Sequence, residues 1–458
     1  MPNKKLDLSQ KKAYVLTVDM GYGHQRAAYP LKDIASPPPE SIPLDENNPI
    51  ISANIYPGIT KIDKVRWEGG RNIYETISRM KKLPLIGQPI FNFMDYLQRI
   101  EPFYPKRDLS KPSAQVKQIY RMIGRGWGKD LIQKLNQEPL PLITTFFSTA
   151  FFAEEHGYKG PIYCLCTDTD ISRAWAPLVP KKSRIQYLAP NKRVKERLQL
   201  YGIPEKHIFV TGFPLPKENI GANLSVLKKD LGERIVQLDP LGKYQKKYRH
   251  TIDHVLGKTA GRAKKTRPLT ITFAVGGAGA QRDIGIQILD SLHAHIDAGA
   301  VTLYLVAGSR QDVFDFYQKE VHRLHLDQKH RGHVHIIFDQ NKDVYFQKFN
   351  QALRQTDILW TKPSELSFYA GLGLPIIMSP TIGSQEDYNK AWLHAIGAGF
   401  EQEDARYTHE WLFDWLSSGW LAEAAMNGFL GAPHNGAAHI EEVVLQGKRS
   451  EIEDIHLL

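Results

Sequence analysis

The chain has 458 residues, 42% hydrophobic and 24% charged, which is typical of a globular protein with two domains and excludes disordered and fibrous classes. No run approaches the roughly 20 apolar residues that a membrane-spanning helix needs, and the polar, basic start MPNKKLDLSQKK predicts no secretory signal. The net charge of +10 is moderately basic and no nucleic-acid-binding motif accompanies it, so we expect no nucleic acid partner.

The first half of the chain alternates short apolar runs with helical patterns. A helix is predicted at 191–201, closed by Gly202 and Pro204. This alternation predicts a parallel, doubly wound sheet in an N-terminal Rossmann-like domain, residues 1–216. The predicted strands are residues 13–19, 50–56, 139–147, 160–167, 184–189 and 207–211.

The first predicted strand runs into the turn Gly21, Tyr22, Gly23 and His24, where a helix begins. Such a turn presents bare backbone N–H groups and a helix N-terminus, which suit a phosphate or a polar sugar. His24 titrates near neutral pH, and we predict that it is a general base for an acceptor hydroxyl. A structural histidine is the alternative.

Residues 57–138 interrupt the alternation with a stretch rich in aromatic and basic residues. A helical subdomain that packs into the core explains this composition, and so does an amphipathic surface for a lipidic acceptor. Its aromatic residues are Trp67, Tyr74, Phe91, Phe93, Tyr96, Phe103, Tyr104, Tyr120 and Trp127.

Cys164 and Cys166 lie two apart in a predicted strand and are expected to be buried, in a protein from a reducing compartment. The Asp-x-Asp pair Asp168 and Asp170 follows that strand. A metal site is one interpretation. We favour Asp168 as a catalytic carboxylate that faces the cleft at the strand's C-terminal end and orients His24, with a helix-capping role as the alternative.

Residues 217–267 are expected to form a basic helical linker or insertion. The stretch 242–267 holds nine Lys and Arg against the single Asp253. Such a charge could contact an anionic membrane surface or phosphates, and a solvated helix explains it as well.

A second alternating series predicts a C-terminal Rossmann-like domain, residues 268–400. Residues 401–458 are expected to be packed helices that cross back to the first domain. Strands are predicted at 268–275, 301–307, 333–338, 356–360 and 374–378, and helices at 281–297, 310–325, 343–354, 364–372 and 385–396.

The first strand of this series is followed by the glycine loop Gly276, Gly277, Ala278 and Gly279, with Gln281 next to it. Glycines let the backbone approach a ligand closely, and the following helix offers its positive end to a diphosphate. A tight turn without a ligand is the alternative.

Polar groups also cluster in residues 362–399. Glu365 is expected in the first turn of a helix, where a carboxylate can hold the two hydroxyls of a ribose or act as a cap. Gly397 and Gly399 are predicted to end the later helix. The donor-binding candidates in this stretch are Lys362, Pro363, Ser364, Glu365, Gln385, Glu386 and Asn389. No resident metal or cofactor is predicted.

GYGHQRAA at 21–28, CTDTDISRAW from Cys166, and KPSELSFYAGLGLPIIMSP from Lys362 followed by GSQEDYN together resemble segments of a known enzyme family. These are the GT-B glycosyltransferases that include the galactolipid synthases, the bacterial diacylglycerol glucosyltransferases and the peptidoglycan lipid-intermediate N-acetylglucosaminyltransferase. The resemblance implies an α/β fold of two facing Rossmann-like domains, with a nucleoside-diphosphate sugar, usually UDP-linked, in the second and the acceptor in the first.

The resemblance further implies metal-independent, inverting transfer to a hydroxyl acceptor, with a lipid such as diacylglycerol as a candidate, in a cytoplasmic protein peripheral to the membrane. The chain departs from the family at Phe368, where a Glu usually binds the donor ribose, and at Tyr22, where a third glycine is common. A nucleotide-sugar epimerase or hydrolase, and a non-catalytic homologue that binds sugar nucleotide or lipid, are therefore the alternatives.

Overall fold

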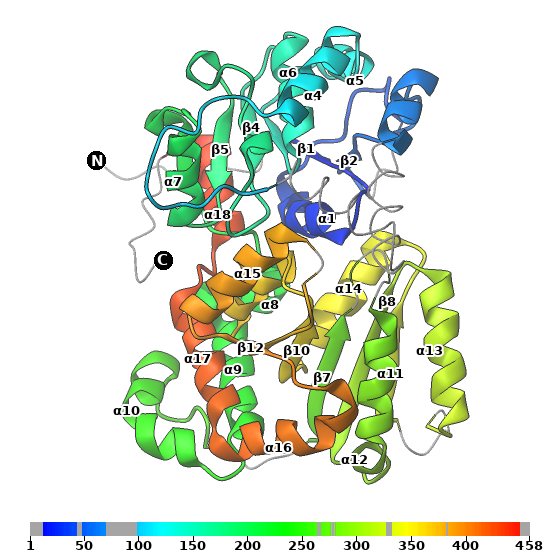
Figure 1. Ribbon diagram of the computed structural model, residues 1–458, viewed down its shortest axis with the longest axis vertical. Helices are drawn as coiled ribbons and strands as arrows, with labels where there is room; N and C mark the ends of the chain where they lie inside the picture. Colours follow the sequence, from blue (N-terminus) through cyan, green and yellow to red (C-terminus); the bar gives the residue numbers. More distant parts are fainter. Residues whose placement is uncertain are drawn as a thin grey trace. The chain divides into compact units, whose positions relative to one another are not determined.

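The computed structural model describes residues 12–43, 48–69, 99–262, 267–274, 276, 279, 281–326, 332–381 and 383–448 (Figure 1). The chain forms two compact units. The first contains Met1–Pro214, Gly383–Gln385 and Asn435–Leu457, and the second contains Leu215–Ile382 and Glu386–His434. The C-terminal segment therefore belongs to the same unit as the N-terminus.

The first unit is built on a six-stranded parallel sheet with the order β2-β1-β3-β4-β5-β6. Its strands are short and almost wholly buried, because helices cover both faces of a parallel sheet, and this is why they read as apolar runs. They are β1 (Tyr14–Thr17), β2 (Ile51–Ser52), β3 (Leu142–Thr144), β4 (Ile162–Leu165), β5 (Gln186–Ala189) and β6 (Ile208–Val210).

Several helices of this unit begin at a capping side chain or a glycine. Asn191 caps α7 by accepting a hydrogen bond from the backbone N–H of Val194, and Ser113 caps α4 through Val116. The helices are α1 (Tyr22–Ala28), α4 (Ala114–Gly124), α5 (Lys129–Leu135), α6 (Phe147–Glu155), α7 (Lys192–Leu200) and α18 (Gly436–Gln446), with the 3₁₀ helices η2 (Tyr29–Ile34) and η3 (Arg173–Trp175).

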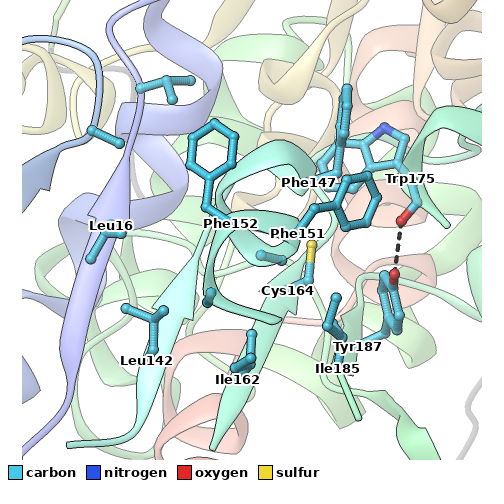
Figure 2. Packing of buried hydrophobic residues seen from close by; sticks show 14 of the residues in the cluster. Leu16, Leu142, Phe147, Phe151, Phe152, Ile162, Cys164, Trp175, Ile185 and Tyr187 are labelled. Carbon is cyan, nitrogen blue, oxygen red and sulfur yellow. Dashed lines mark hydrogen bonds between the residues drawn. The ribbon is translucent and has the colours of Figure 1, made fainter. Parts of the chain in front are cut away.

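The core of the first unit lies between α6 and the sheet (Figure 2). Phe151 and Phe152 of α6 lie over Leu142 and Cys164, and the Tyr187 hydroxyl donates to the backbone oxygen of Trp175 at 2.8 Å. Cys164 and Cys166 are buried free thiols, as predicted, and burial raises the pKa of both.

The aromatic stretch 57–138 contributes to this core. Trp67 and Trp127 are buried, and their rings meet at 4.9 Å while both contact Phe152. Core packing is therefore confirmed for these two residues, whereas Tyr104 is exposed. Four other aromatic residues of this stretch, Tyr74, Phe91, Phe93 and Tyr96, lie outside the described residues.

The second unit has a six-stranded parallel sheet with the order β12-β11-β10-β7-β8-β9. Taken in chain order this is 6-5-4-1-2-3, the strand order of a Rossmann fold. The strands are β7 (Leu269–Ala274), β8 (Val301–Gly308), β9 (Val334–Phe338), β10 (Ile358–Thr361), β11 (Ile376–Met378) and β12 (Gly399–Glu401).

The helices of the second unit include the basic stretch 217–267, which forms α8, α9 and α10. Together with the first unit, this architecture confirms an α/β chain with two Rossmann-like sheets followed by helices. The helices are α8 (Lys217–Ile220), α9 (Ser225–Leu238), α10 (Lys243–Leu256), α11 (Arg282–Ser291), α12 (His293–Asp297), α13 (Gln311–Arg323), α14 (Lys342–Leu353), α15 (Ser384–Ala395), α16 (Thr408–Ser418) and α17 (Trp420–Gly431), with the 3₁₀ helix η7 (Glu365–Leu372).

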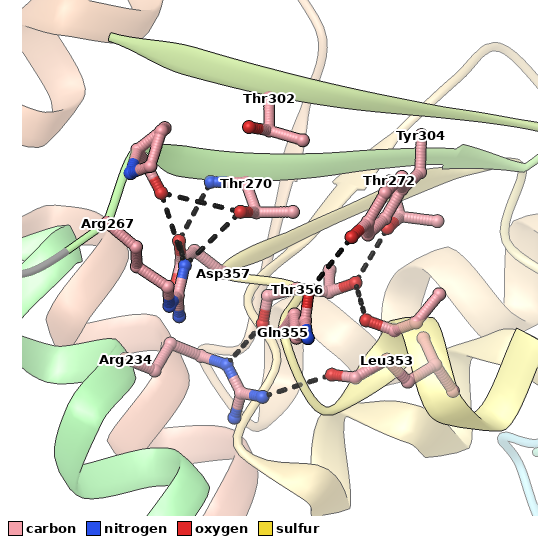
Figure 3. A network of polar contacts seen from close by, with 12 residues as sticks. Arg234, Arg267, Thr270, Thr272, Thr302, Tyr304, Leu353, Gln355, Thr356 and Asp357 are labelled. Atoms are coloured by element: carbon pink, nitrogen blue, oxygen red, sulfur yellow. Dashed lines mark hydrogen bonds and ion pairs between the residues drawn. The ribbon is translucent and has the colours of Figure 1, made fainter. Parts of the chain in front are cut away.

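Two arginines, the buried Arg234 and the half-buried Arg267, connect segments around the second sheet (Figure 3). Arg234 of α9 is 2% exposed, and its guanidinium donates to the backbone oxygens of Thr356, Leu372 and Gly373 at 2.8–3.0 Å. Arg267 forms a two-point ion pair with the buried carboxylate of Asp357, which also accepts the Thr270 N–H. Arg234 thus satisfies carbonyls that the ends of α14 and η7 leave open.

Two local predictions were wrong. The helix predicted at 281–297 is two helices, α11 and α12, separated at Leu292. Gly399, predicted to end a helix, begins β12 and pairs with Ile376, because Gly397 already ends α15 in the left-handed conformation, with φ +67°.

Candidate functional site

Both sheets have a point where the strand order reverses, and in open α/β sheets ligands bind outside the carboxyl ends of the strands at that point. In the first unit it lies between β1 and β3, and in the second between β7 and β10. The residues that follow these four strands include His24, Thr145, Gly276 and Lys362. The topology therefore brings the predicted site residues to the place where each sheet can hold a ligand.

His24 lies in α1, and its ring is held from two neighbouring strand ends. Its Nδ1 is 2.7 Å from the backbone oxygen of Thr145, after β3, and 3.5 Å from the hydroxyl of Thr167, after β4. A carbonyl oxygen can only accept, so Nδ1 carries a hydrogen, and in the neutral imidazole the lone pair then belongs to Nε2. The ring of Phe146 packs edge-on against the imidazole at 4.9 Å.

The turn before His24 needs its glycine. Gly21 is the N-cap of α1 with φ +106°, a conformation that side chains rarely adopt. Gln25 donates to the Asp19 carboxylate at 2.8 Å, and the Asn54 side chain accepts the Asp19 N–H, also at 2.8 Å. These contacts join the ends of β1 and β2, so the segment that presents Tyr22, Gly23 and His24 is fixed on both sides.

Asp168 and Asp170 play different parts. Asp168 is half-buried and follows β4 near Thr167. Asp170 is buried, and its two carboxylate oxygens each accept from the Arg197 guanidinium at 2.8 Å. Asp170 therefore serves an internal ion pair, and among the two only Asp168 stands as a site candidate. The orientation of His24 by Asp168 stays a prediction.

The glycine loop of the second unit is shaped for close approach. Gly279 has φ +65° and its N–H donates to the Gly276 oxygen at 2.8 Å, which makes a tight turn before α11. A Cβ on Gly276 would lie 2.6 Å from Cε of Lys362, so the lysine side chain lies against the glycine. Gly277 and Ala278, predicted donor-binding residues, lie outside the described residues.

Lys362 is one of the cations at this edge of the sheet. Its Nζ forms an ion pair with Glu386 in the first turn of α15. Gln281 connects a third loop, because its side chain donates to the backbone oxygen of Pro380 at 2.7 Å. The loops after β7, β10 and β11 are thus linked by side chains that the sequence singled out as donor-binding.

The other predicted donor residues lie around these loops. Ser364 is the N-cap of η7, preceded by Pro363, and Glu365 begins that helix as expected for a carboxylate in a first turn. Glu365 and Asn389 are buried, and Gln385 is half-buried on α15. Phe368 is buried and its ring meets Trp392 at 5.3 Å, so this departure from the family pattern belongs to the core.

Three groups that contact the candidate site residues were not predicted from the sequence. The Thr145 carbonyl and the Thr167 hydroxyl contact His24, but backbone oxygens and threonines at strand ends carry no distinctive pattern. Arg310, after β8, has its guanidinium carbon 3.8 Å from the Cβ position of Gly279 and pairs with Asp312 at 2.9 Å. The position of Arg310 just past a predicted strand is the sequence feature that could have identified it as a site residue.

Other kinds of site can be assessed in the described residues. They contain no helix long and apolar enough to cross a membrane, and no group of three or more His, Cys, Asp and Glu placed to hold a metal. A surface cavity of about 600 Å³ lies between α13 and the edge strand β9, lined by Phe314, Val321 and Val334 among others. None of the predicted site residues lines this cavity.

Comparison with known proteins identifies no family for the whole chain. Residues 238–332 match a family model described as a domain of unknown function (DUF6938). A search of curated proteins finds no match.

Three solved structures illustrate a similar course of the chain. MurG of Acinetobacter baumannii is 12% identical, with a TM-score of 0.46 over 95% of this chain and 99% of that one. The UDP-GlcNAc 2-epimerase of Neisseria meningitidis, bound to UDP-GlcNAc, is 13% identical, with a TM-score of 0.43 over 78% of this chain and 88% of that one. The UDP complex of S. aureus MnaA is 10% identical, with a TM-score of 0.45 over 95% and 96%.

Proposed function

We propose that the protein is an inverting glycosyltransferase that moves a sugar from a nucleoside-diphosphate sugar, with UDP as the carrier, to a hydroxyl acceptor. The observation that carries this proposal is the hydrogen bond from His24 Nδ1 to the Thr145 carbonyl at 2.7 Å. It holds the imidazole in the tautomer in which Nε2 can accept a proton, as a general base must.

In this proposal the acceptor hydroxyl gives its proton to Nε2 of His24 while its oxygen attacks the anomeric carbon of the sugar. The diphosphate leaves from the opposite face, which inverts the anomeric configuration. General base catalysis of this kind contributes typically 10²–10⁴-fold. Lipids such as diacylglycerol are the acceptors to be tested first.

The donor diphosphate is assigned to the second unit. There the Gly276 and Gly279 turn leads into the N-terminus of α11, and Lys362 and Arg310 supply positive charge. A helix N-terminus and fixed cations stabilise the charge of a leaving diphosphate without a metal. Lys362 is paired with Glu386, so a bound phosphate competes with that carboxylate for the ammonium group.

The first experiment compares His24→Ala with His156→Ala in a transfer assay with UDP-sugars and a panel of lipid and soluble acceptors. His156 is a matched control, because its Nε2 also contacts a backbone oxygen, that of Trp127 at 2.8 Å, away from the proposed site. His24→Ala should lower the transfer rate by at least about 100-fold and leave donor binding intact. Rates within a few-fold of the parent would refute the role of His24.

The same assay separates the alternatives. An epimerase or a hydrolase consumes the donor without acceptor, so an altered sugar or free UDP in acceptor-free samples would contradict transfer. Binding of UDP with no product from any acceptor would identify a non-catalytic homologue. Lys362→Ala should weaken UDP binding and so reduce the UDP-dependent rise in melting temperature, whereas Lys348→Ala, on α14, should not.

A further inference from the structure

The strand β9 ends the second sheet in the described part of the chain, and it is the longest of the four strands that stand at a sheet edge there. The other three, β2, β6 and β12, have two or three residues each. Edge strands of natural proteins are commonly blocked by charged side chains, by proline or by their short length. β9 reads Val-His-Ile-Ile-Phe and has no such block, so it is the edge best suited to pair with another strand.

Alternate residues of β9 turn their backbone groups away from the sheet. The N–H of Leu303 in β8 donates to the His333 oxygen at 2.7 Å. In a parallel ladder every second residue bonds to the same neighbouring strand, so the odd-numbered residues of this stretch face β8. The backbone N–H and C=O groups of Val334, Ile336 and Phe338 therefore point outward, where a further strand would lie.

A groove runs beside this edge. The cavity of about 600 Å³ between β9 and α13 is lined on one side by Val334 and Ile336. The Phe338 ring packs on Phe314 of α13 at 4.7 Å. The other side is a polar stripe of α13, whose residues are three or four apart and so share one face of the helix. The stripe consists of the exposed residues Asp315, Gln318, Lys319 and His322. We call β9 together with this stripe the β9 surface.

The stripe carries opposite charges toward its two ends. Asp315 lies nearer the start of α13, and Lys319 and His322 lie nearer its end. The same helix turned end for end brings Asp315 of each copy beside Lys319 of the other. Opposite charges that face each other in this way fix the orientation of a partner. A second copy of this chain supplies the matching pattern by symmetry, which an unrelated extended peptide does not.

We propose that the β9 surface pairs with the β9 surface of a second copy, antiparallel about a two-fold axis, and forms a dimer. With the axis at Ile336, the two copies of this residue exchange both N–H···O bonds, and Val334 of each copy faces Phe338 of the other. A β-branched residue opposite an aromatic one is a stabilising cross-strand pair.

One outward group of β9 already has a partner. The Phe338 oxygen accepts from Nζ of Lys348 at 3.1 Å, and it can accept a second bond because a carbonyl oxygen has two lone pairs. An interface in which a surface meets its own copy closes at two subunits. This dimer is independent of the reaction proposed above.

The first test is sedimentation equilibrium of the full-length protein over about 1–100 μM, where a dimer of micromolar affinity shows an average mass that rises with concentration. Ile336→Pro should weaken the dimer by at least about 100-fold, because it removes the N–H donors at the centre of the interface. That N–H faces outward in the monomer, so proline is tolerated on this edge strand. An unchanged circular dichroism spectrum checks that the variant is folded.

A charge exchange tests whether the partner is a second copy. Asp315→Lys alone and Lys319→Asp alone should each weaken the dimer by about 10-fold, since two exposed attractions become repulsions. The double variant should restore the affinity of the parent, and so should an equal mixture of the two single variants. Asp414→Lys, at an exposed position of α16, is the control and should leave the dimer unchanged.

Hydrogen exchange gives a second readout, because the amides of residues 334–338 should exchange more slowly as the protein concentration rises. A protein that stays monomeric at about 100 μM would overturn the proposal. So would a dimer that Ile336→Pro leaves unchanged, or one that the double charge exchange fails to restore. Slower exchange at 334–338 on addition of an extended peptide, in a protein that remains monomeric, would assign the surface to a peptide instead.

Discussion

Some single buried side chains are needed for the stability of the fold, and Arg234 is the clearest case. Its guanidinium is enclosed, so burial lowers its pKa to about 10, which still leaves it protonated at neutral pH. It donates to three backbone oxygens: that of Thr356, shortly after α14, and those of Leu372 and Gly373 at the end of η7. Arg234 stabilises the fold by donating hydrogen bonds to these acceptors, because burial of its charge by itself is unfavourable.

Arg234→Met should therefore destabilise the second unit by about 3 kcal/mol or more, since three buried acceptors lose their donors. The measurement is the urea midpoint followed by tryptophan fluorescence. Arg323→Met is the control: Arg323 is half exposed and pairs with Asp290 and Glu320 on the surface, so its loss should cost within about 1 kcal/mol. Equal effects of the two changes would contradict this account.

His434 predicts a pH dependence of stability. Burial lowers its pKa to about 4, and its Nε2–H donates to the Phe429 oxygen at 2.7 Å. An unfolded chain binds the proton at a pKa near 6.5, so between pH 6.5 and pH 4 the unfolded state holds more protons. Stability should fall as the pH drops through this window.

His434→Gln should flatten that dependence, because an amide can donate to Phe429 but does not titrate. Thermal unfolding across pH 4–7 measures the slope, and His250→Gln, at an exposed position of α10, serves as the control. A slope unchanged by His434→Gln and reduced by His250→Gln would show that another group is responsible.

The position of one helix on another is set where their backbones approach closely. Gly428 in α17 is an example, because a Cβ there would lie 2.5 Å from the backbone oxygen of Ala370 in η7. The two helices pack on each other, and η7 begins at Glu365, just after the loop that carries Lys362. No flexible side chain can move aside to relieve such a contact.

Gly428→Ala should thus destabilise the protein by about 1–3 kcal/mol, since the added methyl group must push α17 away from η7. Gly124→Ala is a matched control in a helix: nothing lies within 4 Å of its Cβ position, so the change should be neutral or slightly stabilising. Urea titration of both variants tests the pair, and a neutral Gly428→Ala would refute the close contact.

At the scale of the whole molecule, the end of the chain belongs to the unit formed by its beginning. The helix α18 buries Ile440, Val443 and Leu445, and a Cβ on its first residue, Gly436, would lie 2.2 Å from the Phe213 oxygen after β6. The first unit is therefore completed only after the second has been synthesised.

Deletion of residues 435–458 should destabilise the first unit selectively. Hydrogen exchange followed by mass spectrometry should show faster exchange in the β1 and β6 peptides and little change in β7 and β8. A shorter deletion, of residues 449–458, keeps α18 and isolates its contribution. Faster exchange confined to the second unit would contradict the assignment of α18 to the first.

Periodic features were decided by the sequence itself: apolar runs separated by helical patterns predicted both parallel sheets, because buried parallel strands must be apolar throughout. Glycine turns and polar residues just past strand ends also predicted His24, Gly276 and Lys362 as site residues, because these features are local in the sequence. The strand order, the return of α18 and the partners of His24, Asp170 and Lys362 came only from the tertiary structure. These depend on contacts between residues far apart in the chain, and a one-dimensional pattern does not encode which carbonyl or carboxylate a side chain will meet.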